Sequence, residues 1–96
     1  MVKVEDSYQK EQQDQENFRI AIDITNKIFP GARINEHDDI HHFSVEINKK
    51  KVLEISLLMH RIHLYSLEYF NPAMRLAEEY ENLIKGEITL ERHYKS

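Results

Sequence analysis

The first thirty residues divide into a polar stretch and an amphipathic one. Residues 7–17 (SYQKEQQDQEN) are almost wholly polar. Beyond them, positions suited to burial recur at the three- and four-residue steps of a helix with one buried face; they are Phe18, Ala21, Ile22, Thr25, Ile28 and Phe29. One helix is predicted to cover both stretches, capped by Asp6 or Ser7 and ended by Pro30-Gly31. Because its polar first turns have little to bury, residues 1–16 either fray or project as a helical arm.

Two alternating runs follow, and they predict a hairpin. Apolar and polar residues alternate from Phe43 to Asn48 and again from Leu53 to Leu57. The two apolar sets share one face only if the numbers of paired residues are both odd or both even. A shift of one residue in the pairing would move all side chains of one strand to the other face of the sheet. Pairing Ile47 with Lys51 meets this condition and predicts an odd-length loop between the strands.

The stretch from Val52 to Phe70 contains no Gly, Pro, Asn or Asp, so it gives no clear turn signal. In one interpretation the chain turns near residues 59–61, and residues 62–69 form another strand of a meander. In the other, a helix begins near Ser56. The alternation of aromatic and aliphatic side chains over residues 62–69 favours the strand.

The second helix has the clearest start and stop signals. Asn71 is a natural N-cap, Pro72 suits the first helical position, and Gly86 ends the helix. Its apolar stripe consists of Ala73, Ala77, Tyr80, Leu83 and Ile84. Polarity also alternates within residues 87–96, which favours a short edge strand over a disordered tail.

Together these elements predict one α+β domain over residues 1–96, since a chain of this length forms one modest core. The expected order is an N-terminal helix, a three- to four-stranded antiparallel meander, a C-terminal helix and a short final strand. Double-stranded RNA-binding domains share the order helix, meander, helix, but they place a basic segment at the start of the second helix. Residues 71–75 contain one basic residue, so we do not assign the chain to that family.

Composition narrows the chemistry that this fold could carry. The formal net charge of -4 opposes general binding to nucleic acid, whose phosphates attract Lys and Arg. The only basic run, Lys49-Lys50-Lys51, is expected to be a solubilising hairpin tip. Because the sequence has no cysteine, any metal ion would have to be held by imidazole and carboxylate groups.

We expect neither a signal peptide at residues 1–6 nor a membrane-spanning helix in this sequence. Residues 1–6 lack the apolar core of a signal peptide, and no window reaches the roughly 18 apolar residues of a membrane-spanning helix. We therefore expect a cytoplasmic protein without a membrane partner.

The stretch NEHDDIHH, residues 35–42, is the densest cluster of metal-binding side chains in the sequence. In a meander the first and third turns lie at the same end of the sheet, so this stretch should lie near the segment MHRIH, residues 59–63. The candidate ligands for zinc or another divalent ion are His37, Asp39, His41, His60 and His63. The competing interpretation is a solvated tight turn around Asp38-Asp39, with no cofactor bound.

Two classes of function remain. The first is a small non-catalytic protein-binding or regulatory module, such as an inhibitor or adaptor of a phage or mobile element, that forms a homodimer. Its candidate partner-binding residues are Tyr8, Tyr65, Tyr69 and Tyr94, because amphipathic aromatic side chains are enriched at interfaces. The alternative is a metal- or histidine-dependent hydrolase or nuclease that uses the histidine-rich rim. The first is preferred, because no nucleophile with an evident partner can be identified and no glycine-rich phosphate loop is present.

Overall fold

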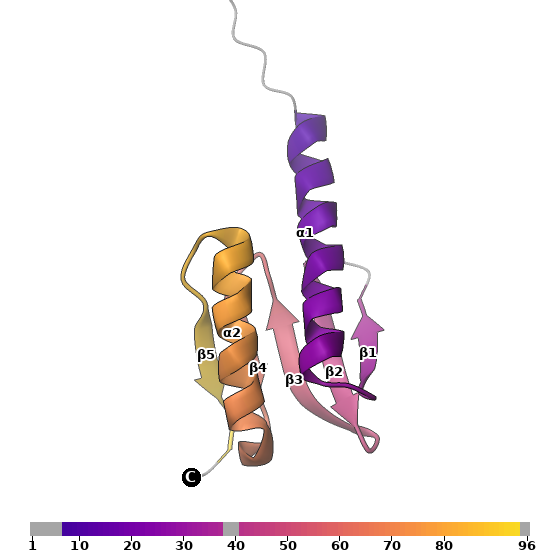
Figure 1. Ribbon diagram of the computed structural model, residues 1–96, viewed down its shortest axis with the longest axis vertical. Coiled ribbons are helices and arrows are strands. Elements are labelled where there is room, and N and C mark those ends of the chain that lie inside the picture. The colour runs from indigo at the N-terminus through magenta and orange to yellow at the C-terminus, as the bar shows by residue number, and fades with distance from the viewer. Residues whose placement is uncertain (1–6, 38–40, 95–96) are drawn as a thin grey trace, which may run out of the picture.

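In the computed structural model, two helices cover one face of the sheet (Figure 1). The sheet has five strands. The structure describes the backbone of residues 7–37 and 41–94, and the side chains from residue 15 onward in those ranges. The elements in chain order are α1 (Ser7–Ile28), β1 (Arg33–Glu36), β2 (His42–Ile47), β3 (Lys50–Ser56), β4 (Arg61–Leu64), the 3-10 helix η1 (Leu67–Tyr69), α2 (Phe70–Ile84) and β5 (Thr89–Arg92). This α+β order confirms the predicted fold class.

The sheet follows the chain order from β1 to β5. Strands β1 to β4 form an antiparallel meander, as predicted. The final strand is also confirmed, but β5 pairs parallel with β4, so the chain crosses over the sheet through α2 before it returns. Parallel pairing requires such a crossover connection, because a tight turn can join only antiparallel strands.

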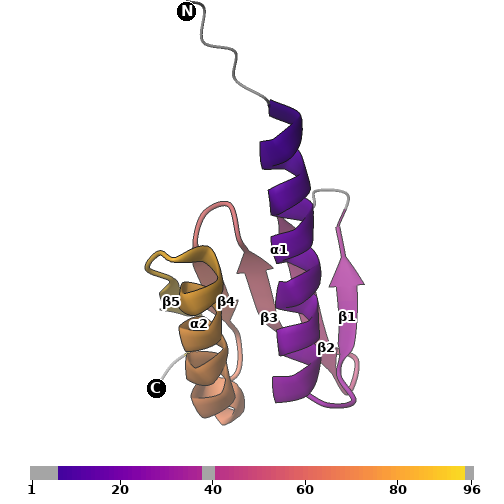
Figure 2. The same ribbon diagram turned by 45° about the horizontal axis from the view of Figure 1, so that its top comes forward.

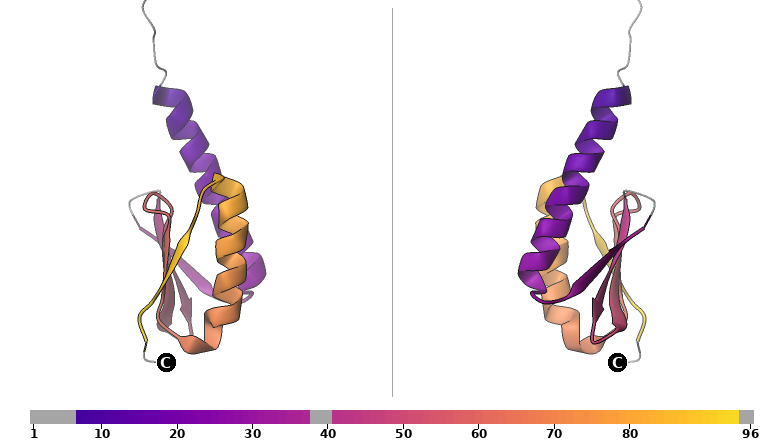
Figure 3. Two further views of the ribbon diagram at one scale, coloured as in Figure 1. Left: turned by 90° about the vertical axis from the view of Figure 1, so that its left-hand side faces the viewer. Right: turned by 90° about the vertical axis from the view of Figure 1, so that its right-hand side faces the viewer.

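One hydrophobic core lies between the helices and the sheet. The inward-facing residues of β2, β3 and β4 are fully buried, among them Phe43, Leu53 and Ile62. From α1, the ring of Phe18 meets Phe43 edge-on with the ring centroids 5.6 Å apart. Figure 3 shows both helices on the same side of the sheet, which leaves the other face without a covering element in the described part of the chain.

Helix α1 is continuous over the polar and the amphipathic stretches, as predicted from the sequence. Its N-terminal turns extend past the end of the sheet, while its C-terminal turns pack beside α2 (Figure 2). None of the described helices is long and apolar enough to cross a membrane.

The hairpin between β2 and β3 keeps the predicted parity but not the predicted loop. Val45 pairs with Leu53, so the apolar residues share one face. The loop, however, is a two-residue turn at Asn48 and Lys49, and Ile47 pairs with Lys50 instead of Lys51. A bulge opposite Val45 and Glu46 accommodates one extra residue of β3. The apolar residues of both strands therefore share one face even though the turn has only two residues.

The chain turns before β4, but the strand predicted over residues 62–69 is shorter than expected. Strand β4 ends at Leu64, and the chain then leaves the sheet through η1. This route brings Tyr69 and Phe70 against the core, whereas Leu67, which the alternating pattern placed in the strand, is 59% exposed. The helix alternative that begins near Ser56 is wrong, because residues 57–60 form a turn and residues 61–64 form β4.

The boundaries of α2 also differ from the prediction. The helix begins at Phe70 with Tyr69 at the N-cap position, whereas Asn71 was expected to cap it. No side-chain cap is needed there because η1 leads directly into α2, and the Phe70 N–H donates to the Leu67 carbonyl. At the other end, the C-cap residue Lys85 adopts the left-handed conformation, and Gly86, which was predicted to end the helix, follows it.

Candidate functional site

The sheet face without helices carries a polar row that crosses four strands. Its members are directly paired neighbours in the strand register; they are Ser44, Glu54, His63 and Glu91. These residues alternate with the buried residues of the same strands, so their side chains stand on the open face. Ser44 is buried, and the side chains of Glu54 and His63 are only 21% and 26% exposed. The row is therefore a partly desolvated polar surface.

Glu54 is the centre of one half of this surface. Its carboxylate lies 2.7 Å from His42 Nε2 and 2.9 Å from Lys51 Nζ, and it accepts a hydrogen bond of 3.2 Å from the Tyr65 hydroxyl. The hydrogen bond from Lys51 is the main cause that lowers the pKa of Glu54 to about 2, against the opposing effect of burial. Glu54 is thus ionised throughout the ordinary pH range and fixes three neighbours at once.

The other half of the surface is a cluster of two histidines and a carboxylate. His63 stands beside Glu91 in the parallel register, and His93 follows two residues later on the same face. His63 Nδ1 lies 2.9 Å from His93 Nε2 and 3.5 Å from Glu91 Oε2. All three ligand atoms lie within 4.8 Å of one another, and no other such group is found in the described residues.

Neighbouring side chains orient this cluster. Arg61 Nη1 lies 3.0 Å from Glu91 Oε2, which holds the carboxylate at the β4–β5 boundary. The Tyr65 ring stacks on the His93 ring with centroids 5.0 Å apart, and Lys51 Nζ lies 5.0 Å from the centroid on the Tyr65 ring. The two halves of the open face are therefore joined through Tyr65.

The predicted histidine rim forms only in part. The first and third turns do lie together, since the Leu57 N–H donates to the His41 carbonyl at 2.7 Å. The rings of His37 and His42 lie 4.7 Å apart near that end of the sheet. Asp39 lies outside the described residues.

The remaining two predicted ligands have separate environments. His60 lies in the turn before β4 with a positive φ of 54°, and its ring faces Gly86, where a Cβ would come within 3.3 Å of it. His63 lies in the cluster on the sheet face. Of the predicted ligands, His63 alone belongs to the three-residue group found in the described chain.

Sequence reasoning missed Glu91 and His93 as partners of His63. A signal was present, because a Glu and a His two residues apart in a predicted strand must share a face. The missing information was that this strand pairs parallel with β4, which brings residues 28 positions apart into register.

The four predicted partner-binding tyrosines have different surroundings. Tyr65 lies on the open sheet face, as described above. Tyr69 packs against Phe29 with ring centroids 6.1 Å apart, and Tyr94 packs against the core. Tyr8 lies in the first turns of α1, where only the backbone is described.

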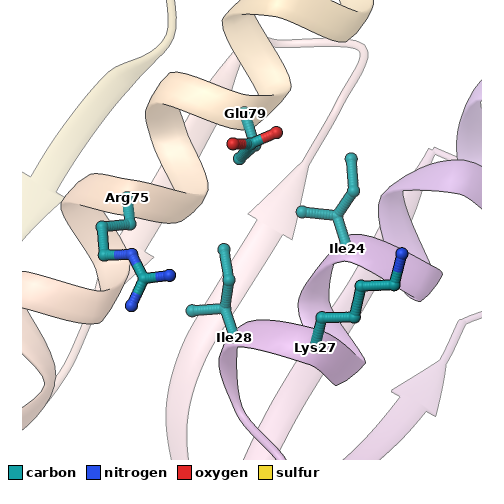
Figure 4. A pocket seen from close by; sticks show the side chains of 5 residues that line it. All are labelled: Ile24, Lys27, Ile28, Arg75 and Glu79. Carbon is teal, nitrogen blue, oxygen red and sulfur yellow. The ribbon is translucent and has the colours of Figure 1, made fainter.

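A second candidate surface lies on the outside of the helical layer. A hollow of about 250 Å³ lies between α1 and α2, and Lys27 is among the residues that line it. In Figure 4 the side chains of Ile24 and Ile28 are directed from α1 toward Arg75 and Glu79 on α2. Ile20, one helical turn before Ile24, is 42% exposed. The three isoleucines thus form an apolar row along α1, flanked by charges of both signs.

Comparisons with protein-family models, with curated proteins and with solved structures found no match to this chain.

Proposed function

We propose that this chain is a small non-catalytic protein-binding module that acts as a homodimer through the outside of its helical layer. The observation that carries the proposal is the isoleucine row Ile20, Ile24 and Ile28 beside the unpaired charges of α2. An apolar strip bordered by charges is the arrangement found at specific interfaces, where the centre excludes water and the rim selects the partner.

The charges of α2 favour a second copy of the same chain as the occupant. Arg75 and Glu79 are one helical turn apart and both line the hollow. Neither forms an ion pair with any residue in the described part of the chain. The Arg75 and Glu79 pair, a free cation beside a free anion on α2, is complementary to itself, and Lys27 of α1 lines the same hollow as a second cation.

A twofold axis perpendicular to the helices provides this match. The axis lies parallel to the helical layer, in the plane of the interface. If it passes over α2 between Arg75 and Glu79, the arginine of each copy faces the glutamate of the other. The same axis passes over α1 between Ile24 and Ile28, which lie across the hollow from Glu79 and Arg75 in Figure 4. Both helices then pack antiparallel against their own copies, as a closed isologous interface requires.

Dimerisation through the helical layer leaves the open sheet face accessible. Two such faces would point away from each other in the dimer, each with its own set of oriented charges around Glu54. This arrangement suits a regulatory inhibitor or adaptor, which acts by covering a partner's surface. Electrostatic complementarity would set the choice and rate of association with that partner.

Sedimentation equilibrium over a range of protein concentrations tests the proposal. The wild type is expected to be a dimer, and Ile20→Glu is expected to weaken dimerisation at least about 10-fold, because it places a charge within the apolar row. Leu58→Glu is the matched control, since Leu58 is 63% exposed but lies in the turn before β4. A wild-type monomer at all concentrations, or equal weakening by both variants, would contradict it.

A further inference from the structure

The cluster of His63, Glu91 and His93 does not take part in the proposed dimer surface, because it lies on the opposite side of the sheet from the helices. We propose that these three residues form a binding site for a divalent transition-metal ion of the zinc type. The inference goes beyond protein binding and rests on separate residues, so either proposal can fail without the other.

The chemistry of the donor set matches zinc. Two imidazole nitrogens and one carboxylate oxygen are a common set of three protein ligands for Zn²⁺, with a fourth position left for water or another ligand. Borderline ions accept both nitrogen and oxygen donors, whereas magnesium and calcium prefer oxygen alone. A site with two histidines therefore selects against the abundant hard cations.

The geometry is close to what a tetrahedral ion requires. With metal–ligand distances of about 2.0–2.1 Å, neighbouring donor atoms lie about 3.3 Å apart. His63 Nδ1 is 2.9 Å from His93 Nε2 and 3.5 Å from Glu91 Oε2, which lie on either side of that value. All three donor atoms lie within 4.8 Å of one another, so rotations of the side chains can bring them around one ion.

The backbone holds the three ligands in place. His63 and Glu91 are paired residues in adjacent strands, and the His93 N–H continues the ladder by donating to the Leu64 carbonyl at 2.8 Å. Ligands on rigid strands keep their geometry better than ligands on loops, and the ion pair with Arg61 and the stacked Tyr65 restrict the side chains further. The site is thus largely formed before an ion arrives.

The open side of the cluster faces solvent. The side chains of His63 and Glu91 are 26% and 40% exposed, so an ion can enter directly and retain a water molecule or accept a ligand from a partner. Metal binding requires unprotonated imidazoles, and the contact between His63 Nδ1 and His93 Nε2 already requires one of these two atoms to carry no proton.

Calorimetric titration of the untagged full chain with Zn²⁺ alone tests the site. We expect one equivalent to bind to the wild type, and His63→Ala and His93→Ala each to weaken the affinity at least about 10-fold. His60→Ala is the matched control and should bind as the wild type does. Glu91→Gln, which keeps the shape and removes the charge, should also weaken binding.

Two results would overturn the proposal. One is wild-type protein that takes up no zinc. The other is zinc binding that survives both His63→Ala and His93→Ala, especially if His37→Ala abolishes it, since that would place the ion at the rim predicted from the sequence.

Imidazole nitrogen chemical shifts of the wild type provide a test that needs no variant to fold. On addition of Zn²⁺, the resonances of His63 Nδ1 and His93 Nε2 should move to metal-bound positions, while those of His60 stay unchanged. Zinc-induced shifts confined to other histidines would contradict the assignment.

Discussion

The hydroxyl groups of Thr25 and Tyr80 are hydrogen-bonded to each other in the core, 55 positions apart in the sequence. Thr25 also donates to the Ala21 carbonyl at 2.7 Å, so a short polar chain links α1 to α2 within otherwise apolar packing. Burial raises the pKa of Tyr80, which keeps its hydroxyl neutral. This contact fixes the relative position of the two helices beneath the proposed dimer surface.

Removing either hydroxyl should destabilise the fold. Tyr80→Phe is expected to cost about 1 kcal/mol, the usual net value of a buried hydrogen bond. Thr25→Val should cost more, about 1–3 kcal/mol, because it leaves the Tyr80 hydroxyl with only a long contact of 3.4 Å to the Ala21 carbonyl. Urea denaturation measures both values, and the double variant should lose less than their sum. Strict additivity would show that the two hydroxyls do not interact.

Tyr94 offers the opposite case. Its hydroxyl is buried and finds no hydrogen-bond partner among the described residues. Since an unsatisfied buried hydroxyl destabilises a protein, Tyr94→Phe is expected to raise the free energy of unfolding by about 1 kcal/mol. Urea denaturation measures this change in the free energy of unfolding, with Tyr80→Phe as the reference for a hydroxyl that has a hydrogen-bond partner. A loss of stability on Tyr94→Phe would reveal a partner for that hydroxyl.

Glu54 should make the stability of the fold depend on pH in the acid range. Its pKa is lowered to about 2, mainly by the hydrogen bond from Lys51, whereas an unfolded glutamate has a pKa of about 4.3. The unfolded chain therefore binds more protons between these values, so the stabilisation is complete above about pH 4.3 and disappears as the pH falls through about 2.

Comparison with Glu54→Gln isolates this contribution. At neutral pH the substitution should cost about 1 kcal/mol, since it weakens the contacts with Lys51 and His42. Thermal unfolding followed by circular dichroism from pH 5 to pH 2 should show a smaller loss of Tm in the variant than in the wild type. Parallel curves for the two proteins would mean that Glu54 titrates normally.

Lys49 is in a conformation that favours glycine. With φ values of 54° at Asn48 and 65° at Lys49, the turn requires the left-handed region at both positions. Lys49→Gly is expected to stabilise the protein by about 1 kcal/mol, because the steric cost of a side chain at positive φ is removed. Lys50→Gly, in the adjoining strand, should destabilise it. Chemical denaturation that ranks the two variants in the reverse order would contradict the turn geometry.

The fold could be predicted from sequence where one side-chain pattern dominated. The alternation around Phe43 and Leu53 revealed both strands and their common face, because only one face of the sheet meets the core. The prediction from sequence was wrong in detail where several backbone arrangements place the same residues in the core. The two-residue turn and the bulge keep the same residues buried as an odd-length loop would, so polarity alone could not distinguish them.

The candidate site was less accessible to sequence reasoning. His63 could be identified as chemically interesting, but its partners Glu91 and His93 arrive through a crossover connection that no local pattern encodes. The turn at residues 57–60 likewise lacks glycine, proline and asparagine, and His60 adopts a positive φ there. Long-range strand pairing sets these features, and it outweighs local preference.

The most direct test of the proposed function is a charge exchange at the helical surface, measured by sedimentation equilibrium. Arg75→Glu should weaken the dimer at least about 10-fold, because it sets like charges against each other across the twofold axis. Adding Glu79→Arg to Arg75→Glu reverses both members of each pair and should restore the wild-type association. A single variant that dimerises as tightly as the wild type, or a double variant that fails to recover, would contradict self-association through this face.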